Sequence, residues 1–488
     1  MRPKDNLILG KHGIIYALGS LGQALLPFLL LPILTERMNP TEYGEYSLIF
    51  ITATLFGSIF YLGMTSSLPR FYFEYDSKKE RDAVYTTSVI LILFGALIQI
   101  SLSLLFGKNI SNFLFNDFLH YKQIFWAFFA NVLNFIILHF ISYLRLRKQA
   151  LKSVFCSFLL PIMSILFIFM VPNLNKNTDI VLHIFKVLAL SNIVVLILLI
   201  PFLIKDFNFN KKIIFEEYKH ILIFGLGSVL FAVSQYFFDL QDKLIVERIV
   251  GLETFGVYTA TVRIASIANI ILVTPFVFVW NPIMMESRKK DNVQNVFKLA
   301  TNIYFTFAGL LLIPIFIFGP YLIEILIKSN FISISDLKMP LFIVSLGVLS
   351  YGLLNIFSAG LLYSKKVYMT TLVLIPLAAI KYLLGYRLIR IFGINGAAFS
   401  SFISTLLMVY IVFLISKRYF IIKLDFKVFK RLLIYLFFIF PFIILTQNII
   451  SNLTSDILLT LASIYFGLCY VYNSFNPVNI YSKMITIN

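Results

Sequence analysis

Long apolar runs separated by short polar segments follow one another along almost the whole chain. A helix needs about 20 apolar residues to cross the hydrocarbon core of a membrane, and about 14 runs approach or exceed that length. They lie near residues 12–35, 44–66, 84–107, 122–143, 153–171, 180–204, 220–246, 255–281, 298–320, 339–363, 368–390, 395–416, 431–447 and 455–473. Strands of a membrane barrel would alternate apolar and polar residues, and these runs do not. The pattern predicts an all-α polytopic membrane protein with about 14 transmembrane helices.

The positive charges between the runs predict how the chain crosses the membrane. If the N-terminus lies in the cytoplasm, most of the 41 lysines and arginines fall in inner segments, and this bias repeats from loop to loop. Both termini are therefore expected in the cytoplasm. Every loop is short, roughly 20 residues at most. We therefore expect no separate catalytic domain and no enzyme.

Composition narrows the class of protein further. Hydrophobic residues make up 59% of the 488 positions, charged residues 13% and aromatic residues 17%, which excludes a soluble enzyme, a nucleic-acid-binding domain and a disordered chain. The net charge of +18 follows from the inner loops and predicts no nucleic-acid partner.

No motif in the sequence points to covalent chemistry or to a cofactor. The chain has no Walker A glycine loop, no HExxH and no nucleophile elbow. Cys156 and Cys469 lie far apart in apolar runs and are interpreted as buried, inert thiols. We expect no catalytic residues, no metal and no cofactor, so the energy for any transport would come from an ion gradient or from consumption of the product.

An internal repeat relates the two halves of the chain. At a nearly constant offset, Lys11-His12 matches Lys219-His220, Gly19-Ser20 matches Gly227-Ser228, Glu36-Arg37 matches Glu247-Arg248, Tyr43-Gly44 matches Phe255-Gly256, and Pro69 and Glu74 match Pro282 and Glu286. Six predicted helices separate the copies, so the repeat is parallel, with a pseudo-two-fold axis along the membrane normal. Such repeats build two bundles around a cavity in alternating-access transporters. We predict six-helix bundles at 1–215 and 216–427, and an extra helix pair at 428–488.

Two stretches resemble a known family. The first runs from Asp242-Lys243 through Gly251 to Gly256-Val257-Tyr258, and the second is Asn395-Gly396-Ala397-Ala398. Both are similar to the polysaccharide and O-antigen (Wzx-type) flippases of the multidrug/oligosaccharidyl-lipid/polysaccharide exporter superfamily. The resemblance covers nearly the whole chain.

The resemblance implies a function and a location. It implies translocation of an undecaprenyl-pyrophosphate-linked oligosaccharide repeat unit from the inner to the outer leaflet of the bacterial cytoplasmic membrane. Such transport serves synthesis of surface polysaccharide such as lipopolysaccharide. It also makes membrane lipid and the polysaccharide polymerase machinery candidate partners.

The seventh predicted helix carries a polar stripe. Gln235, Asp239, Asp242, Lys243 and Glu247 recur at spacings of three and four, which places them on one helical face. The stripe either neutralises itself at the outer helix end or lines a central cavity. We take Asp239, Asp242 and Glu247 as candidates for gating or for coupling to protons or sodium ions.

Four cationic side chains fall within predicted membrane helices or at their ends. Arg263, Lys243, Lys381 and Lys186 are candidate substrate-binding residues, because cations in a span are costly and guanidinium and ammonium groups bind phosphate. The alternatives are snorkelling to the interface and, for Arg263, an ion pair with Asp239 or Asp242.

Several other functions stay open at the level of sequence. A lipid II flippase would share the architecture, but usually has more arginines in its first helices. A multidrug cation antiporter typically has twelve helices and an acidic cavity. A membrane-embedded repeat-unit polymerase would need a large outer loop, and a scaffold would leave the charges in the spans unexplained.

Overall fold

A computed structural model of the chain describes residues 28–75, 77–170, 179–204, 218–288, 293–327, 334–364, 366, 368–422, 424, 426–449 and 452–472. All regular secondary structure in these ranges is helical, which confirms the all-α prediction. Twelve helices among the described residues are long and apolar enough to cross a membrane, so the chain is a multi-pass membrane protein. The total of 14 spans and the pseudo-symmetry stay predictions.

The chain forms two compact units, Met1–Phe237 and Phe238–Asn488. The three-part division at residues 215 and 427 stays a prediction. The first predicted helix lies partly outside the described residues, where Lys11-His12 and Gly19-Ser20 also fall, and residues 28–37 are helical.

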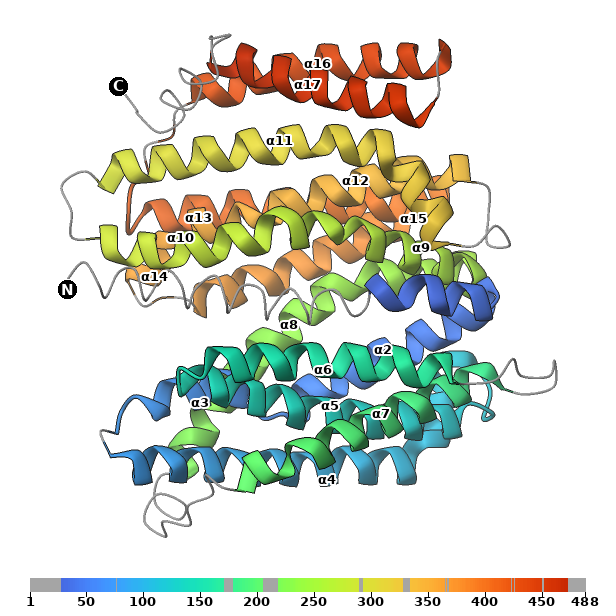
Figure 1. Ribbon diagram of the computed structural model, residues 1–488, viewed down its shortest axis with the longest axis vertical. Coiled ribbons are helices and arrows are strands. Elements are labelled where there is room, and N and C mark those ends of the chain that lie inside the picture. Colours follow the sequence, from blue (N-terminus) through green and yellow to red (C-terminus); the bar gives the residue numbers. More distant parts are fainter. Residues whose placement is uncertain are drawn as a thin grey trace. The chain divides into compact units, whose positions relative to one another are not determined.

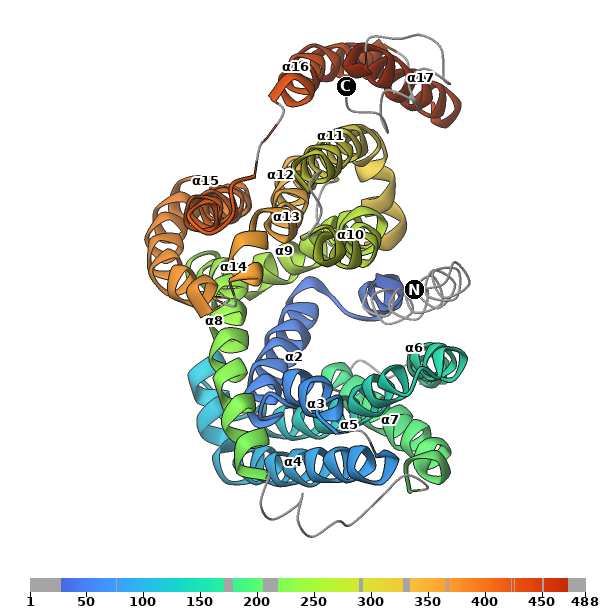
Figure 2. The ribbon, with the colours of Figure 1, turned by 90° about the vertical axis from the view of Figure 1, so that its left-hand side faces the viewer.

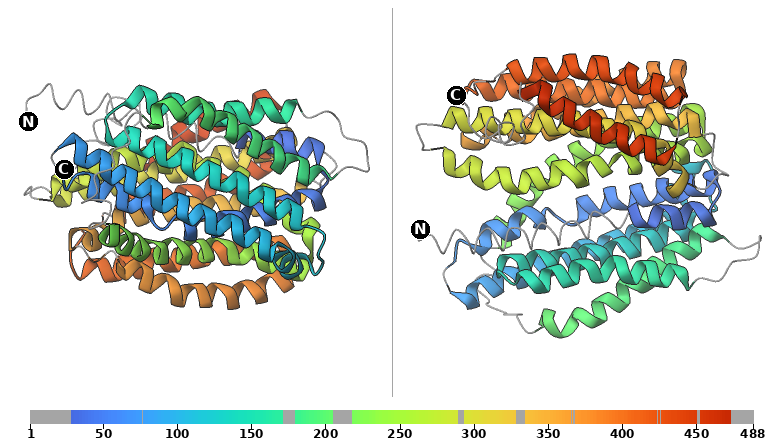
Figure 3. Two further views of the ribbon diagram at one scale, coloured as in Figure 1. Left: turned by 90° about the horizontal axis from the view of Figure 1, so that it is seen from below. Right: turned by 45° about the horizontal axis from the view of Figure 1, so that its top comes forward.

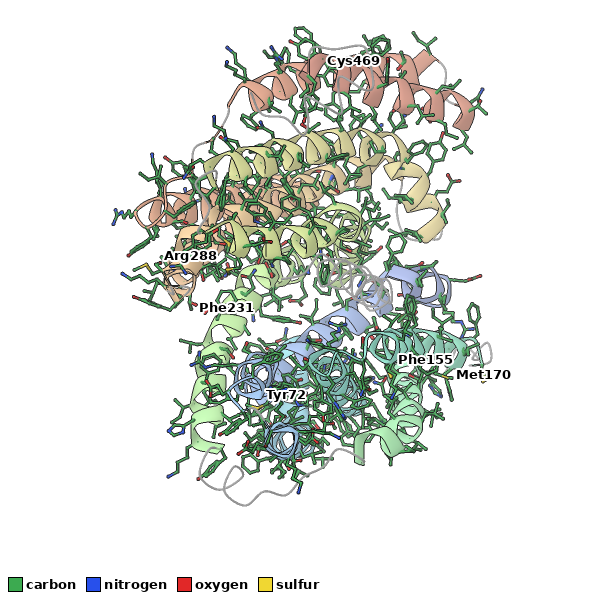
Figure 4. The ribbon with its side chains drawn as sticks, turned by 60° about the vertical axis from the view of Figure 1, so that its left-hand side comes forward. Tyr72, Phe155, Met170, Phe231, Arg288 and Cys469 are labelled. Carbon is green, nitrogen blue, oxygen red and sulfur yellow. The ribbon has the colours of Figure 1, made fainter. Side chains whose placement is uncertain are left out.

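The first unit is built around one central helix. After the 28–37 helix it contains α2 (Pro40–Phe60), α3 (Met64–Tyr72), α4 (Lys78–Phe115), α5 (Tyr121–Leu146), α6 (Ala150–Phe169), α7 (Ile180–Ile204) and the first part of α8 (Tyr218–Val250). Helix α5 packs against α2, α4, α6 and α7 (Figure 2). Tyr72 belongs to the core so formed, whereas Phe155 and Met170 are exposed (Figure 4).

Local sequence explains where α2 begins and ends. Asn39 and Glu42 form a capping box, in which each side chain accepts a hydrogen bond from the other residue's backbone N–H, and Pro40 occupies the first turn. Leu62 and Gly63 both have positive φ, 55° and 68°. These residues divide the predicted run 44–66 into α2 and α3.

The second unit contains the rest of α8, α9 (Leu252–Ala265), η2 (Asn269–Val273), α10 (Thr274–Ser287), α11 (Val293–Leu326), α12 (Ile334–Gly352), α13 (Leu354–Phe357), α14 (Ala359–Tyr363), α15 (Tyr368–Lys417), α16 (Phe426–Ile449) and α17 (Leu453–Tyr472). Helix α12 packs against α9, α11 and α15 (Figure 1). Helices α16 and α17 pack on each other and on α11 (Figure 3).

Two breaks in the second unit have clear causes. The predicted run 255–281 is interrupted by the π-helical turn η2, immediately before Pro275. Proline lacks the N–H that would continue the α-helical hydrogen bonding, so the turn widens there. Helix α15 contains two helices divided at Gly393, whose φ of 54° and ψ of −130° are not helical. This division agrees with the predicted runs 368–390 and 395–416.

Candidate functional site

A buried ion pair joins α8 to the first half of α15. The ammonium of Lys381 lies 3.3 Å from Oδ1 of Asp242, and the two residues expose only 3% and 4% of their surfaces. The same ammonium donates a hydrogen bond of 2.6 Å to the backbone carbonyl of Phe238. A buried charge is costly unless it is paired and hydrogen-bonded, and both conditions are met here.

Two further helices complete the surroundings of Asp242. The hydroxyl of Tyr258 in α9 donates to Oδ2 at 2.6 Å, and the hydroxyl of Ser401 in the second half of α15 donates to the same oxygen at 2.9 Å. The carboxylate therefore joins α8, α9 and both halves of α15. We call Asp242, Lys381, Tyr258 and Ser401 the Asp242 network.

The turn inside α15 makes this arrangement possible. A Cβ at Gly396 would lie 2.0 Å from the carbonyl oxygen of Leu388, so only glycine allows the chain to double back so closely. Ser401 follows this turn by about one helical turn. It therefore reaches the carboxylate to which Lys381, from the other half of α15, is already bound.

A more accessible group of charges adjoins the Asp242 network. Lys243 and Arg263 are half-buried, and Asp239 is exposed. The negative charges of Asp242 and Asp239 and the positive charges of Lys381 and Arg263 all act on the ammonium of Lys243. Three cations thus stand against two carboxylates, which leaves an excess of positive charge on membrane helices of the second unit. Such a group is suited to an anion.

The two remaining predicted site residues are not among the charges that act on Lys243. Glu247 is half-buried one turn beyond Lys243, and the charge of Arg248 acts on it. Lys186 belongs to the first unit, where its exposed ammonium lies 5.9 Å from the ring centroid of Trp126.

The two hydroxyl donors of the Asp242 network were missed by the reasoning from sequence. The sequence places Tyr258 only in the motif that resembles the family, and Ser401 is not among the candidate residues. A signal existed for Tyr258, because it lies in the Gly256-Val257-Tyr258 motif that resembles the family. No pattern in the sequence singles out Ser401 from the neighbouring Ser400 and Ser404.

The first unit contains polar contacts between its helices as well. His139 in α5 forms hydrogen bonds with Tyr61 at 2.8 Å and with Ser88 at 2.7 Å, and Asn131 accepts one from Gln99 at 3.3 Å. His139 and Asn131 therefore form hydrogen bonds between α5 and its neighbours in the first unit.

A second charged cluster lies where α4 is connected to α5. Nδ1 of His120 is 2.9 Å from Asp117, Nε2 is 3.7 Å from Glu45 at the start of α2, and the imidazole stacks on Phe115. Although burial opposes the charged imidazole, hydrogen bonds and the charges of Glu45 and Asp117 raise the pKa of His120. Burial likewise opposes the charged form of Asp117, but its hydrogen bonds to His120 and the Leu119 N–H lower its pKa. The cluster fastens this connection to α2.

Neither cluster forms a metal site, and neither contains a cysteine. Within the described ranges, no group of three or more His, Cys, Asp or Glu side chains is placed to hold a metal ion. Cys156 and Cys469 are both free and buried, as predicted (Cys469 is labelled in Figure 4).

Comparison with known proteins identifies the family. A family described as polysaccharide biosynthesis protein matches residues 9–288, more than half of the chain. The chain belongs to this family. A protein of the Lsg locus of Haemophilus influenzae is 24% identical over 402 residues, which are 76% of this chain and 92% of that protein.

Solved structures agree on the fold. The lipid II flippase MurJ, in an inward closed conformation, has a TM-score of 0.75 at 14% identity, with 94% of this chain and 99% of that chain covered. An inward-facing multidrug resistance MATE family transporter of the MOP superfamily has a TM-score of 0.65 at 16% identity, with 83% and 97% covered. This polysaccharide biosynthesis protein therefore shares the fold of MurJ and of the MATE family transporter. The expectation of a transport protein rather than an enzyme stays a prediction.

Proposed function

We propose that this protein translocates an undecaprenyl-pyrophosphate-linked oligosaccharide repeat unit from the inner to the outer leaflet of a bacterial cytoplasmic membrane, for surface polysaccharide synthesis. The observation that carries the proposal is the excess of positive charge around Lys243 and Arg263. It lies on membrane helices of a chain whose family serves polysaccharide biosynthesis. A pyrophosphate is the charged part of such a lipid, and cationic side chains in a span are its natural partners.

In this proposal the cations have different roles. Lys243 and Arg263 are accessible and bind the pyrophosphate directly. Lys381 is engaged by Asp242 and the Phe238 carbonyl, so it reaches a substrate only after the Asp242 network opens. Opening would release α8 from α15, which couples substrate binding to rearrangement of these helices. The two units alternate access to the leaflets, with both termini in the cytoplasm.

In this proposal, the energy for transport comes from an ion gradient or from consumption of the flipped lipid. Asp239, Asp242 and Glu247 are the carboxylates that would couple transport to protons or sodium ions. Consumption of the flipped lipid by polysaccharide polymerase machinery would also draw the reaction forward.

A deletion strain of the source bacterium tests the proposal. Loss of surface polysaccharide, with complete lipid-linked repeat units accumulating on the inner leaflet, is the expected result. The wild-type chain should restore surface polysaccharide, and Arg263→Gln should not. Arg390→Gln is a matched control, because Arg390 is an exposed arginine of α15 that lies over the ring of Tyr386. Single units that reach the outer leaflet without being polymerised would indicate a polymerase instead. Unchanged polysaccharide with increased sensitivity to cationic drugs would indicate an antiporter.

A lipid II flippase is the second candidate function. It is favoured by the fold similarity to MurJ, which extends over nearly both chains. The same strain separates the two candidates, because loss of lipid II transport causes cell lysis, whereas loss of a surface polysaccharide leaves the cell wall intact.

A further inference from the structure

Three lysines of the first unit lie on two aromatic rings near one end of its helices, the exposed Tyr121 and the half-buried Trp126. The ammonium groups of Lys108 in α4 and Lys122 in α5 are 5.7 and 5.8 Å from the ring centroid of Tyr121. The ammonium of Lys186 in α7 lies 5.9 Å from the ring centroid of Trp126. All three lysines are exposed. Cation–π contacts of this kind favour these orientations of the three side chains.

The geometry of the helices places the three lysines together. Lys122 and Trp126 are four residues apart in α5 and therefore share one face of that helix. Helices α5 and α7 pack against each other, and Gln123 near the start of α5 donates to Asp179, next to the start of α7. The first turns of both helices thus lie at the same end of the unit. Lys186 extends the patch about two turns inward.

The acidic residues at this end are engaged elsewhere. Asp117 and Glu45 are bound to His120, and Asp179 accepts hydrogen bonds from Gln123 and from the Leu182 N–H. In the part of the chain that the structure describes, no carboxylate pairs with Lys108, Lys122 or Lys186, and each ammonium lies on an aromatic ring. The patch therefore presents three uncompensated positive charges.

The surroundings of the patch belong to the bilayer. Leu104, Leu105 and Phe113, which precede and follow Lys108 in α4, expose 65%, 74% and 71% of their surfaces. Tryptophan and tyrosine concentrate at the level of lipid headgroups, and lysine reaches that level along its apolar stem. By the distribution of lysine and arginine, this end is the outer one, where positive charge is disfavoured. Three lysines gathered there call for a negatively charged partner.

We propose that Lys108, Lys122 and Lys186, with Tyr121 and Trp126, form a binding site for the headgroup phosphate of an anionic phospholipid of the surrounding membrane. The ammonium groups bind the phosphate, and the two rings pack against the glycerol backbone and the upper acyl chain. The site belongs to the first unit, whereas the Asp242 network belongs to the second. The proposal stands or falls independently of the proposed transport function.

Tryptophan fluorescence tests the site directly, because the chain contains two tryptophans and one of them lies in the patch. Trp280→Phe leaves Trp126 as the sole reporter. The variant is reconstituted with brominated phosphatidylglycerol or brominated phosphatidylcholine, whose bromine atoms quench nearby indoles. We expect phosphatidylglycerol to bind about 3–10-fold more tightly at Trp126, corresponding to roughly 0.6–1.4 kcal/mol.

Charge variants decide the outcome. The triple variant with Lys108→Gln, Lys122→Gln and Lys186→Gln should lose this preference, so that phosphatidylglycerol and phosphatidylcholine bind about equally. The matched control replaces Lys78, Lys79 and Lys152, exposed lysines at the other end of α4 and the start of α6, and should leave it unchanged. Equal quenching by both lipids in the Trp280→Phe protein would overturn the proposal, as would an unchanged preference in the triple variant.

A second measurement covers the case in which Trp280→Phe does not fold, since Trp280 is buried and donates a hydrogen bond to the Asn355 carbonyl. Native mass spectrometry then compares phosphatidylglycerol retained by the wild-type chain and by the triple-lysine variant, and the proposal requires the variant to retain less. Undecaprenyl pyrophosphate is the competing ligand in both experiments. If it displaces phosphatidylglycerol at equimolar amounts, the site belongs to the transported lipid and the assignment to membrane phospholipid is wrong.

Discussion

The carboxylate of Asp242 in α8 and the ammonium of Lys381 in α15 lie 3.3 Å apart, and both side chains are buried. Removal of one partner from a buried ion pair costs about 3–5 kcal/mol, because the remaining charge is left without compensation. Replacement of both by apolar or neutral groups costs far less. The pair therefore allows the stability of the unit to be separated from its transport activity.

We expect Asp242→Asn and Lys381→Met each to lower the melting temperature of the purified protein. The double variant should recover most of that loss, since no charge remains buried. If the Asp242 network also takes part in transport, the double variant should be stable yet inactive when it is used to complement the deletion strain. A double variant that is both stable and active would restrict the pair to a structural role.

The accessible cations should affect substrate binding instead of stability. A hydrogen bond to a charged group contributes about 1.5–3 kcal/mol, so loss of Lys243 or Arg263 should weaken binding of a lipid pyrophosphate by about 10–150-fold. Arg263→Lys should retain part of the affinity, because it keeps the charge but loses the planar pair of donors. Titration of undecaprenyl pyrophosphate into detergent-solubilised variants measures this. Unchanged affinity in Lys243→Gln and Arg263→Gln would remove both residues from the site.

The sequence predicts the membrane class and most helix positions, because apolar length decides them. Apolar residues continue past Gly319-Pro320 into Leu322–Ile327, so the sequence leaves the outer end of the predicted run 298–320 open, and α11 continues through both residues to Leu326. A proline inside a membrane helix is tolerated when neighbouring helices satisfy the freed carbonyl, and no pattern in the sequence shows those neighbours. The contacts of Asp242 with Tyr258, Lys381 and Ser401 span 160 positions of the chain, so they depend on how the helices pack and could not be predicted from local spacing.

The His120 cluster should make one connection of the first unit sensitive to pH. Because the pKa of His120 is raised in the folded protein, its contribution is complete below the unfolded value of about 6.5 and is lost as the pH rises through the folded pKa. The lowered pKa of Asp117 acts in the opposite direction, and its contribution is lost as the pH falls through that pKa. The connection between α4 and α5 should therefore be most stable at pH values between the folded pKa of Asp117 and the folded pKa of His120.

Hydrogen exchange of residues 116–120 measures this effect, after correction for the intrinsic dependence of exchange on pH. In the wild-type chain, protection should fall as the pH rises above about 6.5 and through the raised pKa of His120. In His120→Gln, protection should be low and independent of pH over this range, because glutamine cannot carry the charge that Glu45 and Asp117 attract. A wild-type profile that matches the His120→Gln profile would contradict the prediction.

Two glycines in one turn of α8 should respond oppositely to the same substitution. A Cβ at Gly225 would lie 2.2 Å from the backbone carbonyl oxygen of Leu62, in the bend between α2 and α3, so Gly225→Ala must push that backbone away. Overpacking of this kind costs about 1–3 kcal/mol. At Gly227 no atom lies within 4 Å of an added Cβ, and alanine is favoured over glycine in a helix by about 1 kcal/mol. Thermal unfolding of the two variants should show a lowered melting temperature for Gly225→Ala and an unchanged or raised one for Gly227→Ala. Equal melting temperatures would mean that the first part of α8 does not pack on the Leu62 bend as closely as the structure shows.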